Sequence, residues 1–182
     1  MKSARDEEFT AYVHARRAHH YRTALMLCGD SHRAEDIVQE ALAKLYAAWP
    51  RASRAGSLDA YVRRIVVNHH LDQVRRAWRR ETSVPLGEDG LDVASRAGST
   101  VEETDALMAA LRRLPIGQRR VVVLRHYWGL SISEVAADLG VTEGTVKSQT
   151  HNALQALRRL LADSLVPTPS SAPDQHDDQE IP

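Results

Sequence analysis

The chain has only one cysteine, Cys28, among its 182 residues. A single cysteine excludes an intramolecular disulfide and a cysteine-rich zinc site, and its place in the apolar run ALMLC favours a buried thiol over a redox sensor. No apolar run approaches the roughly 20 residues that span a bilayer, and the start, MKSARDEEFTAYVHARR, lacks a signal-peptide core. These absences predict a cytoplasmic protein without membrane insertion.

Net charge is also lacking, because 24 Lys and Arg balance 24 Asp and Glu. The balance hides four blocks of alternating sign. Residues 1–80 carry a net charge of +6 and residues 104–165 a net charge of +3, whereas residues 81–103 carry −5 and residues 166–182 carry −4. Basic segments joined and followed by acidic, Gly/Ser/Pro-rich segments predict two nucleic-acid-facing domains, a solvated linker of at most ~70 Å and a disordered tail.

The most informative segment is 131–161, SISEVAADLGVTEGTVKSQTHNALQALRRLL. Ser131 followed by Glu134 fits a capping box that starts a helix. Ala136 is small enough to admit a second helix, Gly140 supplies the left-handed residue that ends the first, and Val146 is spaced to pack beneath. This spacing predicts a helix-turn-helix, and a pair of ordinary core helices is the alternative.

The second helix of this motif is expected to begin at Thr142 and to turn one polar face outward. Its inward stripe is formed by Val146, Thr150, Leu154, Leu157 and Leu161. In a helix-turn-helix the start of the second helix lies in the major groove, where amides read adenine, Lys reaches guanine or phosphate, and hydroxyl groups bond to either. The outward residues are Glu143, Lys147, Ser148, Gln149, His151 and Asn152.

The rest of the chain shows helical periods only. Residues 1–28 fit one helix that Gly29 ends, and a third helix follows Ser57 and continues through NHHLDQVRRAWRR. A second helix between them precedes Pro50, and its apolar stripe is Ile37, Val38, Ala41, Leu42, Leu45, Tyr46 and Trp49. Cations around Trp78 suit phosphate contact with base stacking, although Trp78 could equally continue the core stripe. Leu107, Leu111 and Leu114 form a further stripe before the helix-turn-helix. The predicted fold is therefore all-α, with two helical domains joined by a flexible linker.

The order of these motifs resembles a known family. The runs AEDIVQEALAKLYAAW (34–49), AYVRRIVVNHHLDQVRR (60–76) and LRRLPIGQRRVVVLRHYWGLSISEVAADLGVTEGTVKSQTHNALQALRRLL (111–161) are similar to those of extracytoplasmic-function (ECF, group IV) sigma factors, particularly the small SigE-like group. The resemblance implies region 2 at 1–80, a linker at 81–103, region 4 at 104–165 and a tail at 166–182.

The resemblance also implies a function and a role for each segment. Such a protein is a noncatalytic subunit that binds the bacterial RNA polymerase core, recognises the −35 and −10 promoter elements and promotes DNA melting, and an anti-sigma factor often restrains it. No cofactor or metal is implied. The core-binding residues would be Asp36, Gln39 and Glu40. The −10 contacts would come from Arg63, Asn68, Asp72, Arg75, Arg76 and Arg79. The −35 contacts would come from Ser131, Thr142, Glu143, Thr145, Lys147, Ser148, Gln149, His151 and Asn152.

Other classes of function fit the residues less well. Asp36 and Glu40 could form a carboxylate pair, but no nucleophile, phosphate-binding loop or metal set accompanies them. The adjacent pairs His19-His20 and His69-His70 diverge on a helix and chelate one ion poorly. An operator-binding regulator is the main alternative, although no receiver or ligand-binding module is visible upstream. A protein-interaction adaptor is the third reading.

Overall fold

Helices make up almost all of the part of the chain that the computed structural model describes, which is residues 4–54, 57–81 and 102–164. No strand occurs in those residues, so the all-α prediction is confirmed. The predicted linker and tail lie outside them, apart from the ends of the flanking helices. The elements are α1 (Ala4–Cys28), α2 (Ser31–Ala52), α3 (Leu58–Glu81), α4 (Glu102–Arg113), α5 (Ile116–Val122), the π-helical turn η1 (Val123–Tyr127), α6 (Ile132–Leu139) and α7 (Glu143–Ser164).

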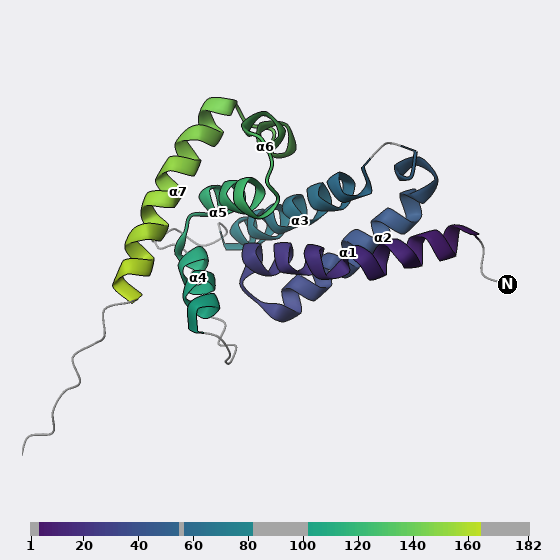
Figure 1. Ribbon diagram of the computed structural model, residues 1–182, viewed down its shortest axis with the longest axis horizontal. Coiled ribbons are helices and arrows are strands. Elements are labelled where there is room, and N and C mark those ends of the chain that lie inside the picture. The colour runs from purple at the N-terminus through teal and green to yellow at the C-terminus, as the bar shows by residue number, and fades with distance from the viewer. Residues whose placement is uncertain (1–3, 55–56, 82–101, 165–182) are drawn as a thin grey trace, which may run out of the picture.

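Helices α1, α2 and α3 pack side by side as an N-terminal bundle (Figure 1). The predicted break after Cys28 is confirmed, since Gly29 has a φ of 73° and the Asp30 carboxylate accepts a hydrogen bond from the Arg33 amide at 2.7 Å. Burial raises the pKa of the Cys28 thiol, which donates to the Asp30 carbonyl, as expected for an unreactive cysteine.

Helix α2 continues past Pro50 to Ala52, so the expected end before this proline was wrong. A proline has no amide to donate to the carbonyl four residues earlier, which here belongs to Tyr46. The Arg5 guanidinium of α1 donates to that carbonyl instead. A contact from another helix thus replaces the missing hydrogen bond and lets the last turn form.

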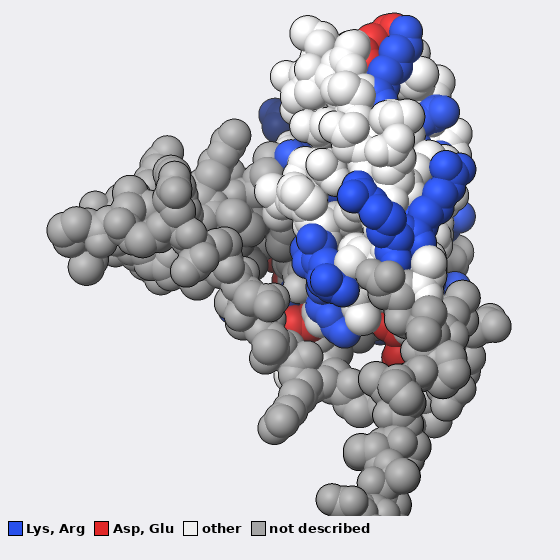
Figure 2. All heavy atoms as spheres, turned by 90° about the vertical axis from the view of Figure 1, so that its left-hand side faces the viewer, with Lys and Arg blue, Asp and Glu red and all other residues white. Residues whose placement is uncertain are grey.

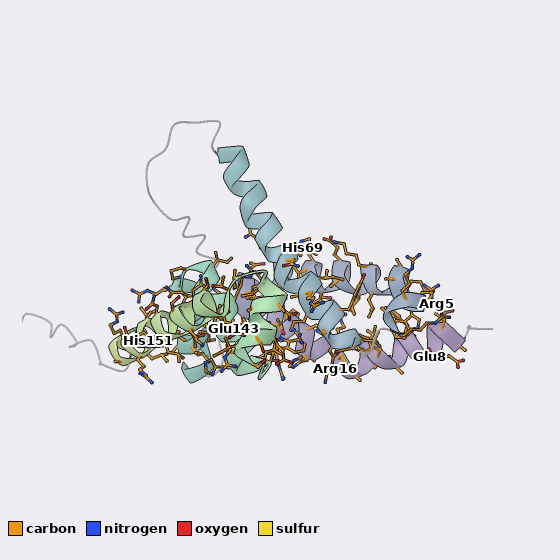
Figure 3. The ribbon with its side chains drawn as sticks, turned by 90° about the horizontal axis from the view of Figure 1, so that it is seen from above. Arg5, Glu8, Arg16, His69, Glu143 and His151 are labelled. Atoms are coloured by element: carbon orange, nitrogen blue, oxygen red, sulfur yellow. The ribbon has the colours of Figure 1, made fainter. Side chains whose placement is uncertain are left out.

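The core of the N-terminal bundle follows the predicted stripe of α2, with Ile37, Leu45 and Trp49 buried against α1 and α3. Tyr46 is an exception, because its side chain stays 39% exposed and its hydroxyl donates to Asp6 at 2.7 Å. The C-terminal half of α3 extends beyond the bundle past His69 (Figure 3). Its backbone is helical, as predicted.

Helices α4 to α7 form a C-terminal domain, on the left in Figure 1. Leu111 and Leu114 are buried in it, but Leu107 is 41% exposed, so the predicted stripe of α4 is shorter than expected. Val121 and Leu124 of the next segment are fully buried. Val121 and Leu124 belong to a hydrophobic core that also includes α1, α2 and α3 residues, so the two parts of the molecule share a core. Leu111 and Leu114 instead lie in a second, smaller cluster with α7 residues.

Candidate nucleic-acid interface

The helix-turn-helix forms with the caps that its sequence predicts. The Ser131 hydroxyl accepts from the Glu134 amide at 3.2 Å and the Glu134 carboxylate accepts from the Ser131 amide at 2.7 Å. These hydrogen bonds hold the pKa of Glu134 below its usual range. Helix α6 ends at Gly140, whose φ is 64°, and the Thr142 hydroxyl then caps α7 by accepting from the Thr145 amide at 3.1 Å.

The small and apolar positions of the motif lie inside it, as expected. Ala136 is 8% exposed and Val146 is fully buried, so α6 and α7 approach closely at these two residues. Leu157 is also buried, while Thr150 and Leu154 are half-buried. This packing fixes the direction in which the first turns of α7 present their outer face.

That outer face is available to a partner. Glu143 and His151 both belong to α7, at its start and in its middle (Figure 3). Gln149 differs, because it is half-buried against Gly117 of α5, where an added Cβ would lie 3.1 Å from the Gln149 amide nitrogen. The Thr145 side chain is half-buried too. The exposed members of the predicted −35 set are Ser131, Thr142, Glu143, Lys147, Ser148, His151 and Asn152.

The surface around α7 is predominantly basic. Blue Lys and Arg spheres run down the face that α7 and α4 present, and few red spheres accompany them (Figure 2). The exposed cations of these two helices are Arg112, Arg113, Lys147, Arg158 and Arg159. A face with this charge suits the phosphate backbone, which supplies most nonspecific affinity for DNA.

The predicted −10 residues lie along α3 in different environments. Asn68 is exposed, whereas Arg63 is buried and donates from Nε to Asp138 of α6 at 2.7 Å. Arg64, which the sequence did not single out, donates to the other oxygen of Asp138 at 2.7 Å. The side chains of Asp72, Arg75, Arg76 and Arg79 lie outside the described residues.

The predicted polymerase-binding residues form one exposed face of α2. Gln39 donates to Glu35 at 3.0 Å, and Glu40 pairs with Lys44 at 2.6 Å and with His69 of α3 at 2.9 Å. Lys44 and His69 lower the pKa of Glu40, so its carboxyl is charged at neutral pH. Asp36 is exposed as well.

Residues at the junction of the two parts were missed by the sequence reasoning. Trp128 donates from its indole nitrogen to the Thr23 hydroxyl of α1 at 3.0 Å, and Asp138 receives the two arginines of α3. Periodicity shows that such residues face inward but not which distant helix they meet. No local sequence pattern identifies these contacts between distant helices.

Both parts of the chain match families of known proteins. The family model of sigma-70 region 2 matches residues 9–80, and that of sigma-70 region 4 matches residues 104–157. The RNA polymerase sigma-E factor of Streptomyces avermitilis is 38% identical over 156 residues, covering 85% of each chain. The ECF RNA polymerase sigma factor SigM of Mycobacterium tuberculosis is 39% identical over 148 residues, covering 80% of this chain and 74% of the relative.

The chain belongs to the extracytoplasmic-function (ECF) sigma factors of RNA polymerase. As a sigma factor it acts in promoter recognition and transcription initiation. The predicted family and function are thus confirmed. None of the helices in the described ranges is long and apolar enough to span a membrane.

Solved structures of sigma factors are also similar to this sigma factor. RpoE of Bartonella quintana, crystallised with the anti-sigma factor NepR, matches with a TM-score of 0.73 at 26% identity, covering 86% of this chain and 98% of that one. CnrH, solved in complex with the cytosolic domain of CnrY, matches with a TM-score of 0.58 at 23% identity over 85% of this chain and 88% of that one. The latter likeness supports the fold alone.

Proposed function

We propose that this sigma factor is a noncatalytic, dissociable subunit that docks on core RNA polymerase through α2 and reads two promoter elements through α3 and α7. The observation that carries the proposal is the order of the two sigma regions, each with an exposed polar or basic face. The chain would supply recognition and leave the chemistry of RNA synthesis to the core enzyme.

Docking would use the polar face of α2. Asp36, Gln39 and Glu40 are spaced so that they share one side of a helix, and an acidic and amide face complements a basic helical partner. Because these side chains are exposed, their charges are better suited to steering association than to adding affinity through burial.

Recognition of the −10 element would use α3. An extruded base costs a few kcal/mol of unstacking, which contacts to the base and its flanking phosphates must offset. Asn68 offers an amide for a base edge, and Arg63, Arg75, Arg76 and Arg79 offer cations for the backbone. Asp72 would orient one of these cations or accept from an exocyclic amine.

Recognition of the −35 element would use the first three turns of α7 in the major groove. Lys147 and Ser148 would contact bases or phosphates, and Asn152 and His151 would lie further along the groove. Ser131, Thr142 and Thr145 would lie near the backbone. Gln149 would reach a base only by leaving Gly117, so we assign it a supporting part.

The partners would be the bacterial RNA polymerase core, promoter DNA and an anti-sigma factor, the last because RpoE of Bartonella quintana was solved in complex with NepR. We propose no cofactor. Copurification tests the assignment, since the tagged chain should comigrate with core polymerase subunits through gel filtration. A chain that shifts promoter DNA alone and never comigrates with the core would instead be an operator-binding regulator.

A further inference from the structure

The two sigma regions are joined by a buried ion pair. Asp138 of α6 is 4% exposed and accepts from Arg63 Nε and Arg64 Nε, both at 2.7 Å. The Arg63 side chain is 10% exposed and the Arg64 side chain 56%. A charge so deeply buried needs its partners, so separating the regions would leave Asp138 to be rehydrated without them.

Aromatic contacts surround this ion pair. The Arg63 guanidinium lies 4.9 Å from the centre of the Trp128 ring, and the Trp128 indole donates to Thr23 of α1 at 3.0 Å. His19 of α1 stacks on Tyr127 with the ring centres 4.7 Å apart. These contacts are directional, and they fix one orientation of the C-terminal domain on α1 and α3.

A third set of contacts completes the end of α1. Its last turn contains no basic residue, although cations are favoured beside the free carbonyls of a helix C-terminus. Arg119 and Arg112 of the C-terminal domain donate to the carbonyls of Leu27 at 2.8 Å and Gly29 at 3.4 Å. The C-terminal domain therefore supplies hydrogen-bond donors to carbonyls at the end of α1, and α3 supplies donors to the Asp138 carboxylate.

This arrangement is incompatible with simultaneous reading of two promoter elements. Elements about two turns of B-DNA apart are separated by roughly 70 Å. Asp138, in the first helix of the helix-turn-helix, instead lies at hydrogen-bond distance from Arg63, which is a −10 contact in the proposed function. The same arginine cannot serve both partners.

We propose that Asp138 is an interdomain latch, which holds the free sigma factor in a closed, autoinhibited state by engaging Arg63 and Arg64. The proposal rests on the proposed function for the role of Arg63. The overall arrangement is similar to that of RpoE in its complex with NepR, which matches 86% of this chain with a TM-score of 0.73. Binding to polymerase and promoter would then include the cost of opening the latch.

The distance between the domains tests the latch without polymerase or DNA. Dyes attached at the exposed positions Ala11 and Ala162, as Ala11→Cys and Ala162→Cys in a Cys28→Ala background, would report closure of the full chain by energy transfer. We expect a mainly closed population in the parent. Asp138→Asn should raise the ratio of open to closed molecules by about tenfold or more, because it removes one partner of a buried ion pair.

Two further variants serve as a second test of the latch and as a control. Arg64→Gln removes one of the two donors from a half-exposed position that should not disturb the core, and it should open the chain in the same direction by a smaller factor. Asp105→Asn removes an exposed carboxylate of the same domain and should leave the distribution unchanged. If Asp138→Asn and Arg64→Gln both give the distribution of Asp105→Asn, the latch is wrong.

Binding to core polymerase then tests autoinhibition. A sigma factor that must open binds with an affinity reduced by its open fraction, so Asp138→Asn should bind core polymerase more tightly by the factor by which its open fraction rises in the distance experiment. An opened variant with parental affinity would overturn autoinhibition. If the variants open but neither they nor the parent bind core polymerase, the proposed function is wrong. The latch would still be supported by the distance measurements.

Discussion

Individual charged side chains in this sigma factor differ in how firmly they are held. Asp59 accepts hydrogen bonds from the Arg16 guanidinium and from the Tyr12 hydroxyl, both at 2.9 Å. Burial raises the pKa of Asp59, but these two partners lower it further, so the pKa stays below its usual range. Lys147 of α7 is exposed and belongs to the proposed −35 contacts. Charges of the first kind serve the fold, and charges of the second kind are free to serve a ligand.

Lys147→Ala should weaken binding to DNA that carries the −35 element. If the lost contact is to phosphate, the slope of log affinity against log salt should fall by about 1 and all sequences should be affected alike. Arg158→Ala is the matched control, since it removes one exposed cation roughly 16 Å further along α7. Fluorescence anisotropy at several salt concentrations measures both, and identical slopes and affinities for Lys147→Ala and the parent would contradict the assignment.

His20 should make stability depend on pH. Its side chain is fully buried near Tyr12, Asp59 and Trp128, and burial lowers its pKa to about 4. The unfolded chain has the higher pKa, about 6.5, so it takes up the proton first. The stabilisation is therefore complete above pH 6.5 and is lost as the pH falls toward 4, by up to about 3 kcal/mol.

Urea denaturation between pH 7 and pH 4.5 would measure this effect. His20→Gln should show a shallower loss of stability on acidification than the parent, because its side chain takes up no proton. His14→Gln alters an exposed histidine of the same helix and should retain the parental slope. Equal slopes for the two variants would show that His20 is not the group responsible.

At the scale of elements, local sequence signals determined most of what was predicted correctly. The capping box, Gly140, the Thr142 cap and the break at Gly29 each act within a few residues, so they could be recognised without the fold. The end of α2 could not, because the Tyr46 carbonyl freed by Pro50 is satisfied by Arg5 from another helix. Exposure of Leu107 likewise depends on where α4 meets its neighbours.

Two glycines of the helix-turn-helix should respond to alanine with opposite sign. Gly140 has a φ of 64° and open space around it, so Gly140→Ala should destabilise by about 1–2 kcal/mol through backbone strain alone. Gly144 lies within α7, and a Cβ there would meet Thr142 Oγ1 at an ordinary 3.8 Å. Gly144→Ala should stabilise by about 0.5–1 kcal/mol. Urea denaturation measures the free energy of unfolding of both variants. If the two substitutions change it in the same direction, this account of the turn is contradicted.

The α2 face should respond to reversal of its charge. Asp36→Lys combined with Glu40→Lys should reduce comigration with core polymerase at least tenfold, while circular dichroism stays unchanged, since an exposed ion pair such as Glu40 with Lys44 contributes at most about 1 kcal/mol. Glu7→Lys combined with Glu8→Lys reverses two exposed acids of α1 as a control. Equal comigration of both double variants would reject α2 as the docking face.

At the scale of the whole molecule, the sequence indicated two domains but not their contact. Asp138 and Arg63 lie 75 residues apart in the chain, and nothing in the local pattern of either helix names the other as its partner. Apolar periodicity identified the buried faces of α2 and α7. It could not show that one hydrophobic core would run from Leu27 of α1 to Val146 of α7.

Transcription reconstituted from purified components tests the central claim most directly. Start sites mapped after expression of the chain would supply templates, and core polymerase would be assayed on them with and without the purified protein. We expect specific run-off transcripts only when the chain is present. Equal initiation at every mapped start in its absence would contradict its assignment as the subunit that selects them.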